Sequence, residues 1–437
     1  MKISCFLLVV SFFVCTMAGN DLLTATEVSN GNTKFTSNLY QILAKEPGNV
    51  FFSPISAHAV LSMIYQGASG ATAEALRKNL YLPEVKATAT GYKNIMTELN
   101  SVENVTLHIA NKVYIANKYQ LNDNFKLTAT KDYLAEAQPL DFKQSVVAAK
   151  EINTWVENKT NNKIKDLIQP DDLDELTRLV LVNAIYFKGN WLHQFPVEHT
   201  RKEKFYLNDK DSVLCDMMHL TDHFEYAEDT ELDAKILRMR YTNKDVSMVI
   251  VLPNSKTGIF ALEQKLANKD LTTLTSQLVS REVIVSLPKF KIETTIDLKD
   301  SLEKLGMGVI FSDAAEFPNL IKGDEPLKVS KAIQKAFIEV NEQGAEAAAA
   351  TGLRIQFRTI TEKMEFLVDH QSIAFIESKI ENTRTILFCG KIGTAEYQTS
   401  LRTFAISNSN SIYMNSWMFW TIYVSMFVSY YSISMMN

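Results

Sequence analysis

The sequence predicts an α+β domain built around large β-sheets. Residues 179–187 and 246–252 form long, nearly continuous apolar runs, which are typical of strands buried on both faces. Helix-period patterns of apolar residues stand ahead of these runs. The 437 residues contain no fixed-period repeat and no linker rich in Pro, Gly or Ser, so residues 35–393 are expected to fold as one domain.

Two helices are expected near the start of the chain. Ser53-Pro54 begins the second helix, because Ser is a preferred N-cap residue and Pro fits the first helical turn. The first helix ends before Pro47-Gly48 and has apolar residues at helical spacing: Phe35, Leu39, Ile42 and Leu43. The second has its apolar face at Val60, Leu61, Ile64 and Tyr65.

Apolar residues at alternate positions predict further strands. One strand is expected at residues 105–115 and another at residues 283–287, each with one apolar face. The apolar residues 387–392 complete the set. These segments and the two long apolar runs supply the expected sheets.

The N-terminus has the composition of a secretory signal peptide. Lys2 provides the positive end, and residues 3–14 form an apolar segment too short to span a bilayer comfortably. Small residues at Thr16 and Ala18 favour cleavage after Ala18. We therefore expect residues 1–18 to be a signal peptide, and the protein to be secreted into the extracellular space.

Cysteines and glycosylation sequons agree with an extracellular protein. Cys215 and Cys389 remain after the signal peptide; Cys389 is expected to be buried, and a bridge between the two stays open. Asn104 and Asn158 each begin an N-glycosylation sequon, and both are expected to carry glycans.

The C-terminal residues 398–437 form a tail of unknown role behind an expected domain of residues 19–397. Residues 403–437 include no charged residue, and residues 417–431 are apolar and aromatic. That core is shorter than the roughly 20 residues of a spanning helix. A poorly ordered tail is favoured, and a glycolipid-anchor signal is the alternative. A membrane is expected as a partner only in that second case.

No constellation in the sequence supports catalysis, so the protein is expected not to be an enzyme. Gly-x-Ser-x-Gly, phosphate-binding Gly-rich and Cys-x-x-Cys motifs are absent. His219 and His223 have a spacing that would place both on one helix face, but no catalytic glutamate or third ligand accompanies them. No metal or cofactor is expected. The net charge of −5 also argues against nucleic acid as a partner.

Six segments together resemble the signature segments of the serpins, a family of serine protease inhibitors. In chain order they are NVFFSPIS (49–56), LSMIYQGASGAT (61–72), NAIYFKGNW (183–191), LPKFKI (287–292), EVNEQGAEAAAA (339–350) and LFCGKI (387–392). The resemblance extends from about residue 33 to 395. It implies three β-sheets with eight or nine helices and an exposed reactive-centre loop.

The resemblance also implies a mechanism. A protease cleaves the loop, the loop inserts into the central sheet as a new strand, and the acyl-enzyme is trapped. It places the reactive bond at Arg358-Thr359 and the breach at Trp191. The shutter residues by position are Ser53, Pro54, Ser56 and Asn183. The hinge residues are Glu342, Gly344, Ala345, Glu346, Ala347, Ala348, Ala349, Ala350 and Thr351.

The hinge residues suit insertion because their alternate side chains are small. Ala345, Ala347, Ala349 and Thr351 would form the inward face of the new strand, where bulky or charged groups would be buried unpaired. No proline in residues 339–359 removes a ladder hydrogen bond. A guanidinium at Arg358 suits the acidic specificity pocket of trypsin-like proteases. Arg354 is a competing reactive residue, and Phe357 would suit chymotrypsin-like proteases.

Two positions depart from the family pattern. Gln334 stands where a histidine is common, and we expect its amide to make the shutter hydrogen bond. Gln371-Ser372 stand where a Pro-Phe pair is common, which concerns packing behind the loop.

The leading hypothesis is a secreted, monomeric inhibitor that forms a covalent complex with a trypsin-like serine protease. The alternative is a non-inhibitory serpin that acts as a carrier, a storage protein or a chaperone. Residues 86–93 contain no dense basic stripe, so activation by a glycosaminoglycan is not expected.

Overall fold

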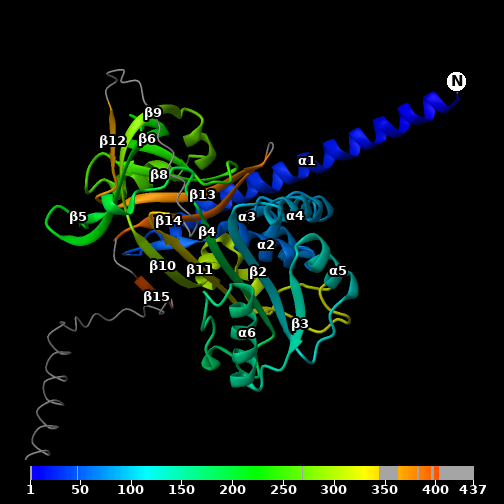
Figure 1. Ribbon diagram of the computed structural model, residues 1–437. Coiled ribbons are helices and arrows are strands. Elements are labelled where there is room, and N and C mark those ends of the chain that lie inside the picture. Colours follow the sequence, from blue (N-terminus) through cyan, green and yellow to red (C-terminus); the bar gives the residue numbers. More distant parts are fainter. Residues whose placement is uncertain are drawn as a thin grey trace, which may run out of the picture. The chain divides into compact units, whose positions relative to one another are not determined.

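The computed structural model describes residues 2–46, 48–267, 269–343, 363–380, 383–394 and 398–402, with side chains from residue 23 to residue 394 (Figure 1). Contacts separate a unit of residues Met1–Thr403 from a second unit, Phe404–Asn437. The second unit lies outside the described residues.

Eight α-helices occur in this described part, and six of them precede the central strand β4. They are α1 (Lys2–Leu43), α2 (Pro54–Tyr65), α3 (Gly70–Asn79), α4 (Val85–Asn100), α5 (Asp123–Asp132), α6 (Ser145–Lys159), α7 (Ile259–Leu266) and α8 (Lys299–Leu302). Within the described ranges, no helix is both long enough and apolar enough to cross a membrane.

The first sheet has six strands. Its order is β15 (Gln398–Arg402), β10 (Phe290–Asp297), β11 (Val329–Val340), β4 (Leu179–Gly189), β2 (Val105–Ala116) and β3 (Glu136–Leu140). β4 is parallel to β11 and antiparallel to β2. β15 pairs with β10, so five residues that sequence analysis assigned to the tail extend the edge of this sheet.

The second sheet has nine strands. Its order is β1 (Val50–Phe52), β14 (Thr383–Ile392), β13 (Ser372–Ile380), β8 (Val246–Pro253), β7 (Ala234–Arg240), β6 (Ser212–Asp229), β9 (Val279–Pro288) and β12 (Met364–Leu367), and β5 (Arg201–Tyr206) also pairs with β6. The 18-residue strand β6 pairs with β5, β9 and β7 along its length. Two of the three expected sheets are therefore joined into one hydrogen-bonded network.

Helix α2 lies in the core between the two sheets. All of its residues are buried, and it contacts β14 of one sheet and β2 and β4 of the other. The Ser53 side chain accepts a hydrogen bond from the N–H of Ser56 at 3.3 Å, and Pro54 is the first helical residue. The predicted start of this helix is confirmed.

Most predicted elements are present with shifted ends. The strands expected at residues 105–115, 179–187, 246–252, 283–287 and 387–392 correspond to β2, β4, β8, β9 and β14. Helix α1 begins at Lys2 rather than near residue 35, so the expected signal peptide and the first predicted helix form one continuous helix. His219 and His223 lie on strand β6, so the helical spacing considered for them is wrong.

Candidate functional site: the seam of the six-stranded sheet

The candidate site is the seam, meaning the pairing of residues 179–187 of β4 with residues 329–338 of β11 (Figure 1). Among the strands that the structure describes, none lies between these two. Because β4 and β11 are parallel, a segment that turns back after β11 would run antiparallel to both. Two antiparallel pairs would then replace one parallel pair, which is slightly less stable per residue. The seam is suited to accept one more strand.

A fully buried glutamine connects both sides of the seam to the start of α2. Gln334 of β11 donates from Nε2 to Asn183 Oδ1 at 2.5 Å and to the Ser53 carbonyl at 2.8 Å. Its Oε1 accepts from the N–H of Ser53 at 2.9 Å. Gln334 therefore makes the hydrogen bond that sequence analysis expected of an amide at this position.

Asn183 of β4 extends the network to β2. Its Nδ2 donates to Ser56 Oγ and to Asn111 Oδ1, and Ser56 Oγ donates to Asn111 Oδ1 at 3.3 Å. All three residues are buried. The structure thus brings the expected residues Ser53, Ser56 and Asn183 together, with Pro54 beside them as the first residue of α2.

Sequence analysis missed Asn111, although a signal was present. Asn111 occupies the same alternation as the apolar residues Ile109 and Val113, so a polar side chain stands on the apolar face of a predicted strand. A buried polar group needs a hydrogen-bond partner. The strand pattern therefore indicated a partner, but not which residue it would be.

Trp191 contacts the residues that follow β11, at the end of the seam where β4 and β11 both end. Its ring is buried and stacks on Tyr241 with a centroid distance of 4.4 Å and an interplanar angle of 11°. Its Nε1 donates to the carbonyl of Asn341 at 3.0 Å, and its backbone N–H donates to that of Gln343 at 3.2 Å. The residues immediately after β11 are therefore fixed to the segment that follows β4.

Glu342, the first expected hinge residue, is buried at the same place. Its carboxylate pairs with Lys289 at 2.9 Å and accepts from Thr200 Oγ1 at 2.8 Å. Its carbonyl accepts from the N–H of Phe195 at 3.0 Å. Burial opposes ionisation, but the hydrogen bonds from Lys289 and Thr200 outweigh it and hold the pKa of Glu342 below its ordinary value.

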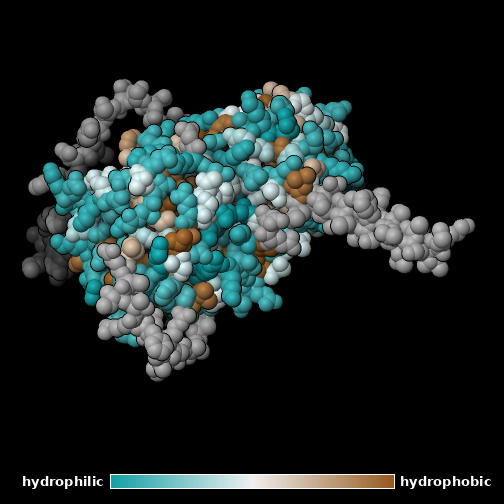
Figure 2. Space-filling view, turned by 90° about the horizontal axis from the view of Figure 1, so that it is seen from above, coloured by the Kyte–Doolittle hydropathy of each residue, from teal (hydrophilic) through white to brown (hydrophobic). Residues whose placement is uncertain are grey.

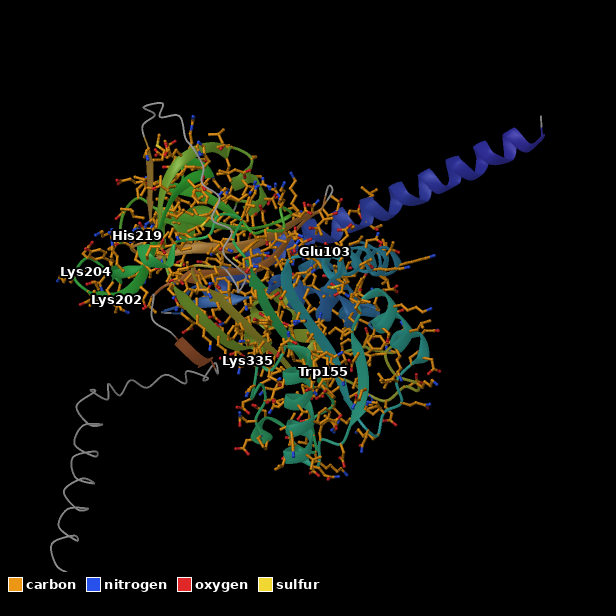
Figure 3. All side chains as sticks on the ribbon, viewed as in Figure 1. Glu103, Trp155, Lys202, Lys204, His219 and Lys335 are labelled. Carbon is orange, nitrogen blue, oxygen red and sulfur yellow. The ribbon has the colours of Figure 1, made fainter. Side chains whose placement is uncertain are left out.

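Helix α6 is held against β2 and β3 by a cluster around Glu136. The carboxylate pairs with Lys112 at 3.0 Å and with Lys159 at 2.9 Å, and it accepts at 3.1 Å from Nε1 of Trp155, which Figure 3 labels. Burial opposes ionisation of Glu136, but these hydrogen bonds lower its pKa to about 2. Lys112 also lies 5.0 Å from the Trp155 ring centroid.

The segment between α6 and β4 is tied to the other side of the seam. Lys335 of β11, labelled in Figure 3, pairs with Glu293 at 2.8 Å and donates to the carbonyl of Lys165. Lys331 of β11 pairs with Asp172. Since side chains alternate along a strand, Lys335 points away from the face on which Gln334 contacts α2. The segment from α6 to Asp172 therefore crosses the seam on that opposite face.

Several expected site residues lie outside the described part of the chain. They are the hinge residues Gly344, Ala345, Glu346, Ala347, Ala348, Ala349, Ala350 and Thr351, the reactive bond Arg358-Thr359, and the alternatives Arg354 and Phe357.

The remaining predictions concern surface and core positions. Asn104 and Asn158 are both exposed. Cys215 and Cys389 are buried free thiols, so the bridge left open in the sequence is not formed; burial raises the pKa of Cys215 to about 11. In the described ranges no group of three or more His, Cys, Asp or Glu side chains is arranged to hold a metal ion.

Comparisons with known proteins agree with this geometry. The family model for "Serpin (serine protease inhibitor)" matches residues 30–394. Alaserpin of Manduca sexta is 40% identical over 365 residues, covering 83% of this chain and 92% of that protein. Antichymotrypsin-2 of Bombyx mori is 38% identical over 355 residues, covering 80% and 94%. The crystal structure of Serpin48 of Tenebrio molitor has a TM-score of 0.77 and 37% identity, covering 84% of this chain and 98% of that one.

Proposed function

The chain belongs to the serpin family, and on this premise we propose that it is a secreted suicide-substrate inhibitor of trypsin-like serine proteases. The observation that carries the proposal is the direct pairing of β4 and β11 over a buried polar network. The seam is closed there by the backbone pairing of β4 with β11 and by the Gln334–Asn183 hydrogen bond, and no described strand lies between the two. Alaserpin, antichymotrypsin-2 and Serpin48 are the named relatives that support inhibition over a carrier role.

The proposed reaction begins at the bond between Arg358 and Thr359. The protease serine attacks the carbonyl carbon of Arg358, the amine of Thr359 leaves with a proton, and an acyl-enzyme ester forms. The freed segment after Glu342 then enters the seam and carries the acylated protease with it. Entry requires the Gln334–Asn183 hydrogen bond to break, because the new strand separates β4 from β11.

The hinge sequence supports insertion. Small side chains at Ala345, Ala347, Ala349 and Thr351 leave the inward face unobstructed. About a dozen new ladder hydrogen bonds at ~0.5–1.5 kcal/mol each would stabilise the inserted state by on the order of 10 kcal/mol before entropy. That is comparable to the total stability of a domain, so a metastable starting state is physically reasonable.

Secretion and glycosylation belong to the same proposal. Residues 1–18 are the proposed signal peptide, and the exposed Asn104 and Asn158 are the proposed glycan sites. The inhibitor is proposed to act as a monomer without a cofactor. Residues 398–437 have no proposed role.

Incubation with trypsin tests the proposal directly. We expect an SDS-resistant complex with a mass equal to the protease plus the inhibitor fragment that ends at Arg358, and a separate fragment whose new N-terminus is Thr359. Arg358→Ala should abolish the complex, while Arg354→Ala, as the matched control, should retain it. Complete digestion by trypsin without any complex would instead favour the alternative hypothesis of a non-inhibitory carrier, storage protein or chaperone.

A further inference from the structure

A polar pocket lies on the nine-stranded sheet beside the β7–β8 turn, where β7 and β13 end and β8 begins. It has a volume of about 260 Å³. The charged residues that line it are Arg238, Arg240, Lys244, Asp245, Glu377 and Lys379. Four cationic groups line the pocket with two carboxylates, and a third carboxylate, Glu225, pairs with both arginines, so a small positive excess remains although the whole chain has a net charge of −5. This local reversal of charge favours a negatively charged ligand.

One of the lining residues, Arg238, has an unused donor. Arg238 is nine-tenths buried; its terminal nitrogen atoms pair with Glu225 at 2.7 Å and with Glu377 at 3.0 Å. Its Nε is also buried, yet it has no hydrogen-bond partner within the described part of the chain. A buried donor without a partner costs free energy unless a ligand or water accepts from it.

Two lysines stand at the rim. Lys244 and Lys379 are exposed, and neither ammonium group makes an ion pair or hydrogen bond with a described residue. Their backbones are fixed: Arg240 Nη1 donates to the carbonyl of Lys244 at 3.1 Å, and the N–H of Lys379 donates to the carbonyl of Asp245 at 2.7 Å. Both lysines are therefore held beside the pocket while their charges remain available.

The two carboxylates differ in how far they oppose an anion. Glu377 is buried: its Oε1 accepts from Arg238 at 3.0 Å, and the Nε of Arg384 lies 3.6 Å from its Oε2, so two cations offset its charge, although Oε2 has no hydrogen-bond partner among the described residues. Asp245 is exposed, where water screens it. We propose that this pocket binds a tetrahedral oxyanion, a phosphate or sulfate group, between Arg238, Lys244 and Lys379.

The pocket residue Arg240 directly precedes Tyr241, whose ring stacks on Trp191 at the end of the seam. The carbonyl of Arg240 accepts from the N–H of Leu192 at 2.9 Å, and the next residue, Tyr241, stacks on Trp191. The N–H of Thr242 donates to the carbonyl of Asn190 at 2.7 Å. A bound oxyanion that draws the β7–β8 turn inward will therefore change the surroundings of Trp191. Binding itself does not rest on the proposed function.

Titration of the unreacted protein with inorganic phosphate, followed by calorimetry and tryptophan fluorescence, tests the site. Sodium chloride at equal ionic strength controls for screening, and a sulfated disaccharide is titrated in parallel. We expect saturable binding of phosphate, the disaccharide, or both, and affinity on the order of tenfold weaker in the Lys244→Gln/Lys379→Gln double variant. Phosphate binding alone identifies a free oxyanion as ligand, and disaccharide binding alone identifies a sugar-linked sulfate.

Lys204→Gln is the matched control, because Lys204, labelled in Figure 3, is an exposed lysine on β5 and is not among the residues that line the pocket. It should bind with unchanged affinity. The proposal is overturned if neither ligand binds saturably, or if Lys204→Gln weakens binding as much as the double variant does. Trypsin inhibition without added anion should be unchanged in the double variant, so failure of this site and failure of the inhibitor assignment give different results.

Discussion

At the scale of single residues, Gln334 has the most consequential contacts in the seam. Its amide uses both donor and acceptor, and it joins β11 to β4 and to the chain before α2. Its partner Ser53 is 281 positions away in the sequence. A hydrophobic replacement would leave buried backbone and side-chain groups without partners, which costs more than the lost hydrogen bonds contribute.

Replacing Gln334 by leucine should therefore destabilise the uncleaved protein. We expect the free energy of unfolding to fall by about 3 kcal/mol, because the Ser53 N–H and Asn183 Oδ1 lose a partner in the core. Urea denaturation measures this loss. Gln334→His is the control, since an imidazole keeps hydrogen-bonding atoms at this position and should lose less. Equal losses in both variants would show that the amide contacts are not what stabilises the seam.

His58 of α2 gives the stability a pH dependence. Its ring is buried, Nε2 lies 2.7 Å from the Leu80 carbonyl and Nδ1 contacts Tyr92, and burial lowers its pKa from 6.5 to about 4. As the pH falls below 6.5, the unfolded state takes up the proton before the folded state does. This contribution to stability is therefore complete above pH 6.5 and is lost between pH 6.5 and 4, at up to about 1.4 kcal/mol per pH unit.

Urea denaturation at intervals between pH 7.5 and 5 checks this slope. His58→Gln should reduce the slope, because an amide does not titrate in this range, although the variant will be less stable at pH 7.5. If the parent and the variant lose stability in parallel as the pH falls, another group is responsible.

At the scale of elements, the sequence of the hinge gives the clearest prediction of function. Residues 345–351 lie outside the described part of the chain, so the prediction that they insert as a strand rests on the alternation of small side chains alone. The start of the hinge is described, and it is anchored by Trp191 and by Lys289. Insertion must therefore begin from a fixed end, and each inward side chain in turn must pass into the seam.

Ala349→Arg should convert the inhibitor into a substrate. An inward arginine would be buried unpaired between β4 and β11, and a barrier raised by only about 1.4 kcal/mol slows insertion tenfold. The stoichiometry of inhibition of trypsin measures the change. Ala350→Arg is the matched control, because residue 350 would face outward and should leave the stoichiometry nearly unchanged. Equal effects of both substitutions would contradict the inward assignment of Ala349.

The predictable elements were those with one clear period. α2, β2 and β9 were found because their apolar residues repeat at helical or strand spacing, and β4, β8 and β14 were found as apolar runs. β5 and β6 were missed: half of β5 is exposed, and along β6 the buried positions change from odd numbers at Cys215 and Met217 to even numbers at Phe224 and Tyr226, so no single alternation extends through it. The two histidines on β6 were considered at helical spacing because four positions separate them.

At the scale of the whole molecule, polar residues dominate the face seen in Figure 2, and hydrophobic residues appear there in small groups. The notable feature is therefore internal: a central sheet that pairs directly across its seam yet is suited to one more strand. Cleavage of the loop would release that strand, so the intact and cleaved molecules should differ in stability although their covalent composition differs by one hydrolysed bond.

Limited cleavage within residues 344–362 by a protease that is not trapped should raise the thermal unfolding midpoint. With on the order of 10 kcal/mol from new ladder hydrogen bonds, the shift should be about 10 °C or more. Differential scanning calorimetry of intact and nicked protein measures it. An unchanged midpoint would favour the non-inhibitory alternative, because it would mean that the nicked segment does not enter the sheet.

The sequence by itself determined the apolar periods, the cap of α2, the polar position on the apolar face of β2, and the alternating small residues of the hinge. These are local properties, set by the spacing of side chains along one strand or helix. Only the tertiary structure decided that Asn111 joins Asn183, that Glu342 pairs with Lys289, and that Tyr241 stacks on Trp191. The physical reason is strand register: which distant side chains become neighbours depends on how strands pair and on which face each residue lies, and no single segment encodes that pairing.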